Sequence, residues 1–253
     1  MLALAVSFFI TAILYAAVGF GGGSTYNALL VLADTDYRIL PAIALICNLI
    51  VVSGGTYRFA KAGHVDLKRI MPWIITSVPA AWLGGFIQIS EEMFIGLLGF
   101  SLLAAGLRMI FIKNKKQKLR QEIINKYRFL PPIIGVFLGL LAGLVGIGGG
   151  IFLAPILYLL HWDNAKKIAA ACSVFILVNS LAGLSGQLMK LGDLQLIGEI
   201  SAYWLLFPAV LIGGQIGSIM GAKYLNLKTI SLMTAILILY VSLRLIWRWW
   251  GMM

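Results

Sequence analysis

Long apolar segments separated by short charged turns make up nearly the whole of this 253-residue chain. Six of the segments hold about 20 residues or more, the length at which a helix crosses the hydrocarbon core of a bilayer, about 30 Å thick. The six predicted spans are residues 39–59, 70–89, 93–112, 168–189, 196–222 and 227–249. The pattern therefore predicts an all-α polytopic membrane protein.

Two further apolar stretches are each interrupted by a cluster of glycines. GFGGGSTYNALLVL at residues 19–32 and GLVGIGGGIFLAPILYLL at residues 143–160 share the pattern G-x-G-G-G, at an offset of 127 residues. The apolar arm after each cluster holds about ten residues, and a helix of that length rises only about 15 Å. Because this is about half of a hydrocarbon core, each stretch predicts a re-entrant hairpin that enters and leaves by the same face.

Other landmarks recur in the same order along the chain. The matching pairs are Asp36 and Asp163, Asp66 and Asp193, PAAWLGG (79–85) and PAVLIGG (208–214), and residues 89–110 and 225–246. Four pairs in one order indicate an internal duplication. We therefore predict a first membrane repeat at 1–112, a basic cytoplasmic linker at 113–129 and a second membrane repeat at 130–253.

Composition excludes a soluble fold. Hydrophobic residues make up 61% of the chain and charged residues only 11%, against about 25% charged residues in soluble domains. The net charge of +11 comes mostly from lysines and arginines that flank apolar segments, and not from a basic face interleaved with aromatic residues, so nucleic-acid binding is not expected. The amino terminus lacks a basic n-region and a cleavage site, which makes it the first membrane element.

The distribution of charge predicts the orientation of the chain. With re-entrant hairpins each half crosses the bilayer three times, so the second half is inverted. Sixteen of the 20 lysines and arginines then fall on one side, which the positive-inside rule makes cytoplasmic. Parallel halves would give 15 against 5, so charge does not separate the two arrangements. We predict two inverted repeats, each a glycine-broken helical hairpin plus three transmembrane helices, with the inversion resting on arm length.

The short helices that begin at Ser24 and Ile151 are predicted to point their N-termini toward the membrane midplane. Backbone at that depth needs partners for its N–H and C=O groups. Free N–H groups at a positive helix end form an anion site, and secondary transporters place such ends between inverted repeats. The glycines also have a purely structural interpretation, because glycine permits a tight turn and close helix packing.

Polar residues near the clusters and inside apolar spans complete the predicted site. Asn48 and Asn179 lie within predicted spans, where an amide needs a partner that a neighbouring helix or an anion would supply. The candidate substrate-binding residues are Gly21, Gly22, Gly23, Ser24, Thr25, Asn48, Gly148, Gly149, Gly150, Ile151, Asn179 and Ser180. The weaker candidates are Ser53, Thr56 and Gln187.

The two glycine motifs, the halves of four segments, the basic central loop and the length together resemble the TauE/SafE family of sulfite exporters and related anion permeases. The resemblance covers essentially the whole chain. It implies export of a small sulfur-containing anion, such as sulfite, sulfoacetate or another organosulfonate, across the bacterial inner membrane. One departure is that Asn27 and Ala28 stand where the second motif has Ala154 and Pro155, so the two halves need not contribute equally.

Three other functions stay open at this point. An anion channel would use the same helix dipoles as a selectivity element. GLSG at 183–186 matches the G-x-S-G of rhomboid proteases, but His64 and His161 fall in polar loops, so Ser185 has no buried base. An accessory subunit of a larger membrane complex is the third alternative.

Cofactor and metal sites are not predicted. Cys47 and Cys172 lie within apolar segments and show no metal-ligand spacing. The span centres hold no Asp, Glu or His, which argues against a proton relay through a carboxylate. The membrane potential would then drive export, with proton or sodium coupling through backbone and hydroxyl ligands as the alternative. Five tryptophans are predicted to be interfacial anchors: Trp73, Trp162, Trp247, Trp249 and Trp250. The expected partners are a small anionic substrate and the lipid bilayer, with a homodimer left open.

Overall fold

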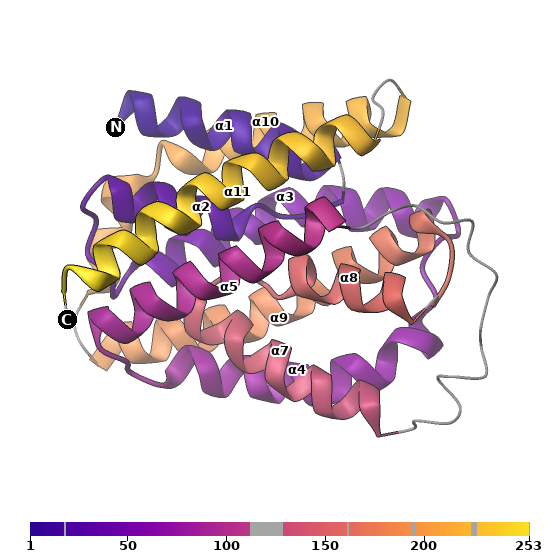
Figure 1. The fold of residues 1–253 in the computed structure, drawn as a ribbon, viewed down its shortest axis with the longest axis horizontal. Helices are drawn as coiled ribbons and strands as arrows, with labels where there is room; N and C mark the ends of the chain where they lie inside the picture. The colour runs from indigo at the N-terminus through magenta and orange to yellow at the C-terminus, as the bar shows by residue number, and fades with distance from the viewer. Residues whose placement is uncertain (18, 112–128, 161, 194–195, 224–226, 253) are drawn as a thin grey trace.

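The structure, a computed structural model, describes residues 1–17, 19–111, 129–160, 162–193, 196–223 and 227–252. Within these residues the chain forms helices and no strand (Figure 1). The all-α prediction is therefore confirmed. The predicted linker at 113–129 lies, apart from Phe129, outside the described residues.

Helices follow one another closely in both halves of the chain. The first half contains α1 (Leu2–Ala17), α2 (Gly23–Leu32), α3 (Leu40–Lys61), α4 (Leu67–Phe86) and α5 (Glu91–Phe111). The second half contains α7 (Leu130–Val145), α8 (Gly150–Leu159), α9 (Ala165–Asp193), the 3-10 helix η1 (Ile197–Tyr203), α10 (Leu206–Lys223) and α11 (Leu227–Trp250). The breaks between α1 and α2 and between α7 and α8 fall at the two glycine clusters, as the sequence predicts.

Length and composition identify the helices that are able to cross a membrane. Among the described residues, Leu40–Lys61 and Lys166–Gly192 satisfy both criteria. A bent pair, η1 with Leu206–Met220, would add a third span. The span predicted over 196–222 is not a single straight helix, because η1 and α10 meet at 57°. Pro208 explains the break, since it lies in the first turn of α10, where a missing N–H removes no helical bond.

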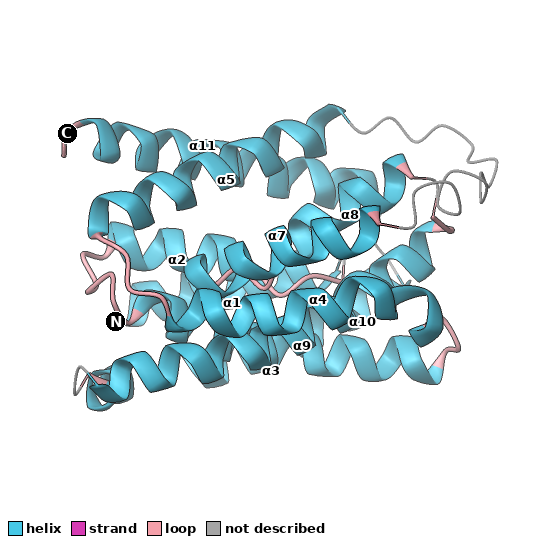
Figure 2. Cartoon of the chain, turned by 90° about the horizontal axis from the view of Figure 1, so that it is seen from below, coloured by secondary structure: helices cyan, strands magenta, loops and turns pink. Residues whose placement is uncertain are grey.

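The two halves interlock. α7 packs on α4, and α1 packs on α10, so the first arm of each hairpin lies against a helix of the other half. α3 packs on α9, and α5 lies beside α11 (Figure 1). When each helix is replaced by its equivalent in the other half, the α4–α7 pair becomes the α10–α1 pair, and the α3–α9 and α5–α11 pairs stay the same. Both chain termini lie at the same end of the bundle (Figure 2), as an inverted repeat requires. The duplication and its inversion across a bilayer stay predictions.

Glycines allow the hairpin arms to touch their partner helices through the backbone. A Cβ built on Gly139 of α7 would lie 2.1 Å from the carbonyl oxygen of Ser77 on α4. At the corresponding interface, a Cβ built on Gly217 of α10 would lie 2.2 Å from the carbonyl oxygen of Ile13 on α1. Both distances are far below a van der Waals contact, so larger residues would push the helices apart. The position of each hairpin therefore depends on the other half.

Burial corrects part of the tryptophan prediction. Trp73 and Trp162 are only 1% and 2% exposed and belong to one hydrophobic cluster with α9, so they are not interfacial anchors. The guanidinium of Arg69 lies over the Trp162 ring, 4.5 Å from its centroid, which gives this tryptophan a cation–π partner. Trp247 is 83% exposed, and its anchoring role stays a prediction. Cys47 and Cys172 are free and buried.

Candidate functional site

The glycine clusters adopt backbone conformations that other residues rarely take. In the first break Gly19 and Gly22 have φ of 85° and 91°, and in the second Gly146 and Gly149 have φ of 74° and 76°. These aligned positions lie in the left-handed region, where an L side chain costs roughly 1–2 kcal/mol. Gly148 is also left-handed, with φ of 76°. The reversal of each hairpin therefore requires the motif.

The two breaks meet inside the protein. The Asn27 side chain on α2 donates through Nδ2 to the carbonyl oxygen of Val145, the last residue of α7, at 2.6 Å. A Cβ built on Gly23 would lie 2.8 Å from the carbonyl oxygen of Gly146. Segments more than 100 residues apart in the sequence thus form one buried junction.

Asn48 of α3 lies at this junction and contacts both breaks. Its Oδ1 accepts a hydrogen bond from the Gly23 backbone N–H at 2.8 Å, which satisfies one free donor at the N-terminus of α2. Its Nδ2 has no partner among the described residues. The same nitrogen lies 3.1 Å from a Cβ built on Gly148. Asn48 is fully buried, so its free donor is shielded from bulk solvent.

Ser180 of α9 approaches the same point from the other side. Its Oγ lies 2.9 Å from the Cβ position of Gly148. The hydroxyl is fully buried and has no hydrogen-bond partner within the described part of the chain. Two buried donors from different halves therefore converge on Gly148. The preceding residue, Asn179, instead donates to the carbonyl oxygen of Phe175 within α9 at 2.8 Å.

The N-terminus of α8 has no side-chain cap. Gly149 is the residue that precedes the helix. The N–H groups of Phe152 and Leu153 bond to the Gly149 carbonyl oxygen, whereas those of Gly150 and Ile151 show no acceptor within the described residues. These two N–H groups belong to the first turn, which has no intrahelical acceptors. The positive end of the α8 dipole lies here as well.

Ser24 and Thr25 are used inside the first hairpin. Both hydroxyls bond to the Tyr15 hydroxyl of α1, at 3.2 Å and 2.8 Å. The two hydroxyls therefore bond to the first arm of their own hairpin, and neither caps α2. Sequence reasoning did not single out Tyr15, although a tyrosine inside an apolar segment needs a hydrogen-bond partner when buried. Tyr26, whose hydroxyl has no partner among the described residues, lies against Gly22.

The weaker candidates join helices elsewhere. Gln187 donates to the carbonyl oxygen of Gly143 on α7 at 2.8 Å, and the hydroxyls of Thr56 and Ser173 bond at 2.6 Å. Ser53 is exposed and bonds within α3. None of these contacts reaches Gly148.

The GLSG segment of the protease alternative packs helices. A Cβ built on Gly186 would lie 2.3 Å from the carbonyl oxygen of Trp82 on α4, and one on Gly183 would lie 3.2 Å from Gly143 Cα. Ser185 Oγ donates to the Ala182 carbonyl oxygen of its own helix at 2.7 Å. Its neighbours are therefore those of a helix-packing motif.

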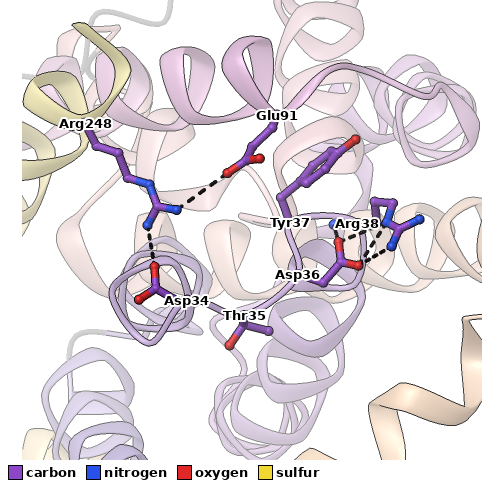
Figure 3. Close-up of a pocket in the computed structure, with 7 residues that line it drawn as sticks. All are labelled: Asp34, Thr35, Asp36, Tyr37, Arg38, Glu91 and Arg248. Atoms are coloured by element: carbon purple, nitrogen blue, oxygen red, sulfur yellow. Dashed lines mark hydrogen bonds and ion pairs between the residues drawn. The ribbon is translucent and has the colours of Figure 1, made fainter. Parts of the chain in front are cut away.

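Charged residues gather in a cleft beyond the C-terminal end of α2. This cleft, of about 390 Å³, is lined by Asp34, Thr35, Asp36, Tyr37, Arg38, Glu91 and Arg248 (Figure 3). Arg248 of α11 donates to Asp34 Oδ1 at 3.0 Å, and its guanidinium lies 3.6 Å from Glu91 of α5. Hydrogen bonds from Arg38 lower the pKa of Asp36. Ion pairs thus join α11, α5 and the end of α2.

A second charged cluster follows α8. Asp163 accepts from Arg69 of α4 at 2.6 Å and from Lys167 at 3.3 Å. Burial opposes ionisation of Asp163, but the Asn164 backbone N–H, Lys167 and Arg69 outweigh it, so the pKa of this carboxyl is lowered. The cluster ties the loop between α8 and α9 to α4.

An all-α fold with apolar spans and uncharged, glycine-broken hairpins belongs to the class of polytopic membrane proteins. The family described as sulfite exporter TauE/SafE matches residues 3–245, so this chain belongs to the TauE/SafE sulfite exporter family. Membership of a transporter family gives no support to the protease alternative.

Named relatives are membrane transporters as well. A probable membrane transporter protein of Sinorhizobium fredii is 33% identical over 96% of this chain and 97% of its own length. One from Methanocaldococcus jannaschii is 29% identical, over 71% of this chain and 69% of its own. One from Bacillus subtilis is 24% identical, over 78% and 83%. No solved structure matches this chain.

Proposed function

We propose that this protein is a secondary transporter that binds a small sulfur-containing anion at the N-terminus of α8, between the two glycine breaks. One observation carries the proposal. The unpartnered donors Asn48 Nδ2 and Ser180 Oγ both lie within about 3 Å of the Cβ position of Gly148, next to the two free N–H groups of α8.

The energetic argument concerns these unsatisfied donors. A buried donor without an acceptor costs about 1–3 kcal/mol, and a native protein keeps few of them. An oxyanion has several acceptor oxygens, so one bound anion would satisfy the two side chains and the Gly150 and Ile151 N–H groups together. Charge-assisted hydrogen bonds of this kind are about twice as strong as neutral ones. The positive end of α8 adds to the attraction.

Family membership and the distribution of charge support the proposed substrate class and direction. The proposed substrate is sulfite, sulfoacetate or another organosulfonate, moved outward across the bacterial inner membrane, with the basic linker in the cytoplasm. A negative interior favours export of an anion by about 2.3 kcal/mol per charge at 100 mV. The candidate site holds neutral donors, so the potential acts on the charge of the substrate itself.

The binding site is tested with one alanine at Gly148. The methyl group of Gly148→Ala would lie between the two donors, so we expect the affinity for sulfite to fall at least tenfold, measured by calorimetry in detergent. Gly63→Ala is the matched control, because Gly63 is also left-handed, with φ of 71°, and has nothing within 4 Å of its Cβ position. Both variants carry the same backbone strain, but only the first fills the site.

Equal sulfite affinity in both folded variants would overturn the site assignment. The mode of transport is read from the same proteins in proteoliposomes. Saturable counterflow of labelled sulfite, lost in Gly148→Ala and kept in Gly63→Ala, is the expected result. Ion conductance far above the turnover of a carrier would instead identify an anion channel.

A further inference from the structure

One apolar side chain of α9 lies directly against the proposed anion site. Ile176 is 2% exposed and stands one helical turn before Ser180. A Cβ built on Gly150 would lie 2.3 Å from Ile176 Cγ1 and 2.4 Å from Cδ1, and one on Gly148 would lie 2.9 Å from Cγ2. Ile176 therefore touches both sides of the turn that begins α8.

The position of this side chain is held rigidly. α9 runs without a break from Ala165 to Asp193, so Ile176 and Ser180 keep a constant separation on one helix face. An isoleucine in a helix adopts essentially one χ1 rotamer, because two heavy atoms branch from its Cβ. Around it the breaks are closed by other apolar groups: Phe175 Cε1 lies 2.9 Å from the Cβ position of Gly149. A ligand at the donors thus meets a fixed apolar wall.

We infer that Ile176 is a specificity-determining residue that limits the size of the transported anion. The inference rests on the proposed site at Gly148. The donors of Asn48, Ser180 and α8 hold the oxygen atoms of the anion, and Ile176 occupies the space into which a substituent on sulfur would extend. Among the anions proposed above, Ile176 therefore narrows the substrate to compact sulfite, and sulfoacetate or another sulfonate with a two-carbon tail is rejected.

The magnitude follows from the behaviour of apolar pockets. One methylene group in a tight pocket is worth about 1–3 kcal/mol, or about 10–200-fold in discrimination. Ile176→Ala removes three carbon atoms of the wall, whereas Ile176→Val removes one and keeps the β-branch. We therefore expect graded relaxation, with alanine above valine.

The experiment compares sulfite with isethionate, a two-carbon sulfonate, by calorimetry on purified full-length protein. The ratio of isethionate affinity to sulfite affinity is expected to rise at least tenfold in Ile176→Ala and by a smaller factor in Ile176→Val. Ile168→Ala is the matched control, since Ile168 is a 1% exposed residue of the same helix that packs in the cluster around Trp162. Its ratio should equal that of the wild type.

Two results would overturn the role of Ile176 while leaving the proposed site intact. One is a sulfite-binding Ile176→Ala or Ile176→Val protein with the wild-type ratio. The other is wild-type protein that already binds isethionate as tightly as sulfite. If wild-type protein binds neither anion, the proposed function itself fails and this inference fails with it. Should the alanine variant not fold, the valine variant still decides the question.

Discussion

The two glycine breaks share a motif but differ in how their helix N-termini are satisfied. Gly19 and Gly22 have the same left-handed backbone as Gly146 and Gly149. At the first break, Asn48 Oδ1 already accepts the Gly23 N–H. At the second break no side chain caps α8. The Asn48 carboxamide oxygen thus accepts a hydrogen bond from the N-terminus of α2. An oxygen of a bound anion would accept hydrogen bonds from the N-terminus of α8 in the same way.

This difference supports the proposal of one anion site built by two halves, in place of two equivalent sites. Asn48 comes from the first half and Ser180 from the second, and both converge on Gly148. The sequence difference between the two glycine motifs also makes the two breaks unequal. Asn27 bonds to the Val145 carbonyl oxygen, whereas Ala154, at the corresponding position, has no side-chain donor to return the bond.

The largest expected effect comes from Asn48→Asp. The new carboxylate keeps an acceptor for the Gly23 N–H at a helix N-terminus, where negative charge is favourable, but it loses the donor and repels an anion. Like charges in contact cost several kcal/mol, so sulfite affinity should fall at least about 100-fold. Calorimetry checks the affinity and circular dichroism the fold.

Asn48→Ala separates the effect of charge from that of the lost hydrogen bonds. It removes the acceptor of the Gly23 N–H and the Nδ2 donor without adding a charge. We expect a loss of sulfite affinity of about tenfold, smaller than that of the aspartate. If the aspartate variant binds sulfite as the wild type does, Asn48 does not face the anion.

An effect of intermediate size on sulfite affinity should distinguish the hydroxyl of Ser180 from that of Ser24. Ser180→Ala removes an unpartnered donor, so sulfite affinity should fall about five- to tenfold while thermal stability stays unchanged or rises. Ser24→Ala removes a hydroxyl already bonded to Tyr15, so its effect should be on stability and not on affinity. Paired calorimetry and thermal-unfolding measurements read both quantities. If Ser24→Ala lowered the sulfite affinity and Ser180→Ala lowered only the stability, the anion would bind at the first break and not at the second.

The smallest effect concerns the carboxylates after each short helix. The pKa of Asp163 is lowered in the folded protein, so its ion pairs stabilise fully above the ordinary carboxyl pKa of about 4, and this stabilisation is lost as the pH falls through the lower folded value. Asp163→Asn should lower the melting temperature at neutral pH by about 2–4 °C and weaken the loss of stability at acid pH.

Asp36→Asn is the matched control for this measurement. The partner of Asp36 is Arg38, only two residues away, whereas Arg69 is 94 residues from Asp163. A local pair joins no distant elements, so the melting temperature should change less. Equal shifts in both variants would show that the Arg69 contact does not stabilise the fold.

The apolar and glycine patterns were sufficient to predict the all-α class and the helix breaks at both glycine clusters. Their period and length are local properties, and the left-handed glycines confirm why the motif occurs where the chain reverses. The bend within the span at 196–222 was not predicted, because an apolar run does not reveal where a proline in the first turn will start a new helix. Trp73 and Trp162 were misplaced for a related reason: nearness to a segment end says nothing about which helices will cover a side chain.

The sequence by itself determined that this is an all-α membrane protein with two glycine breaks of the TauE/SafE type. The tertiary structure alone decided that Asn48 caps α2 and frees a donor toward Gly148, and that Ile176 closes the turn of α8. These contacts join residues 25 to 100 positions apart. Hydropathy and motif spacing report what each segment prefers, whereas the partner of a buried donor depends on how the helices pack.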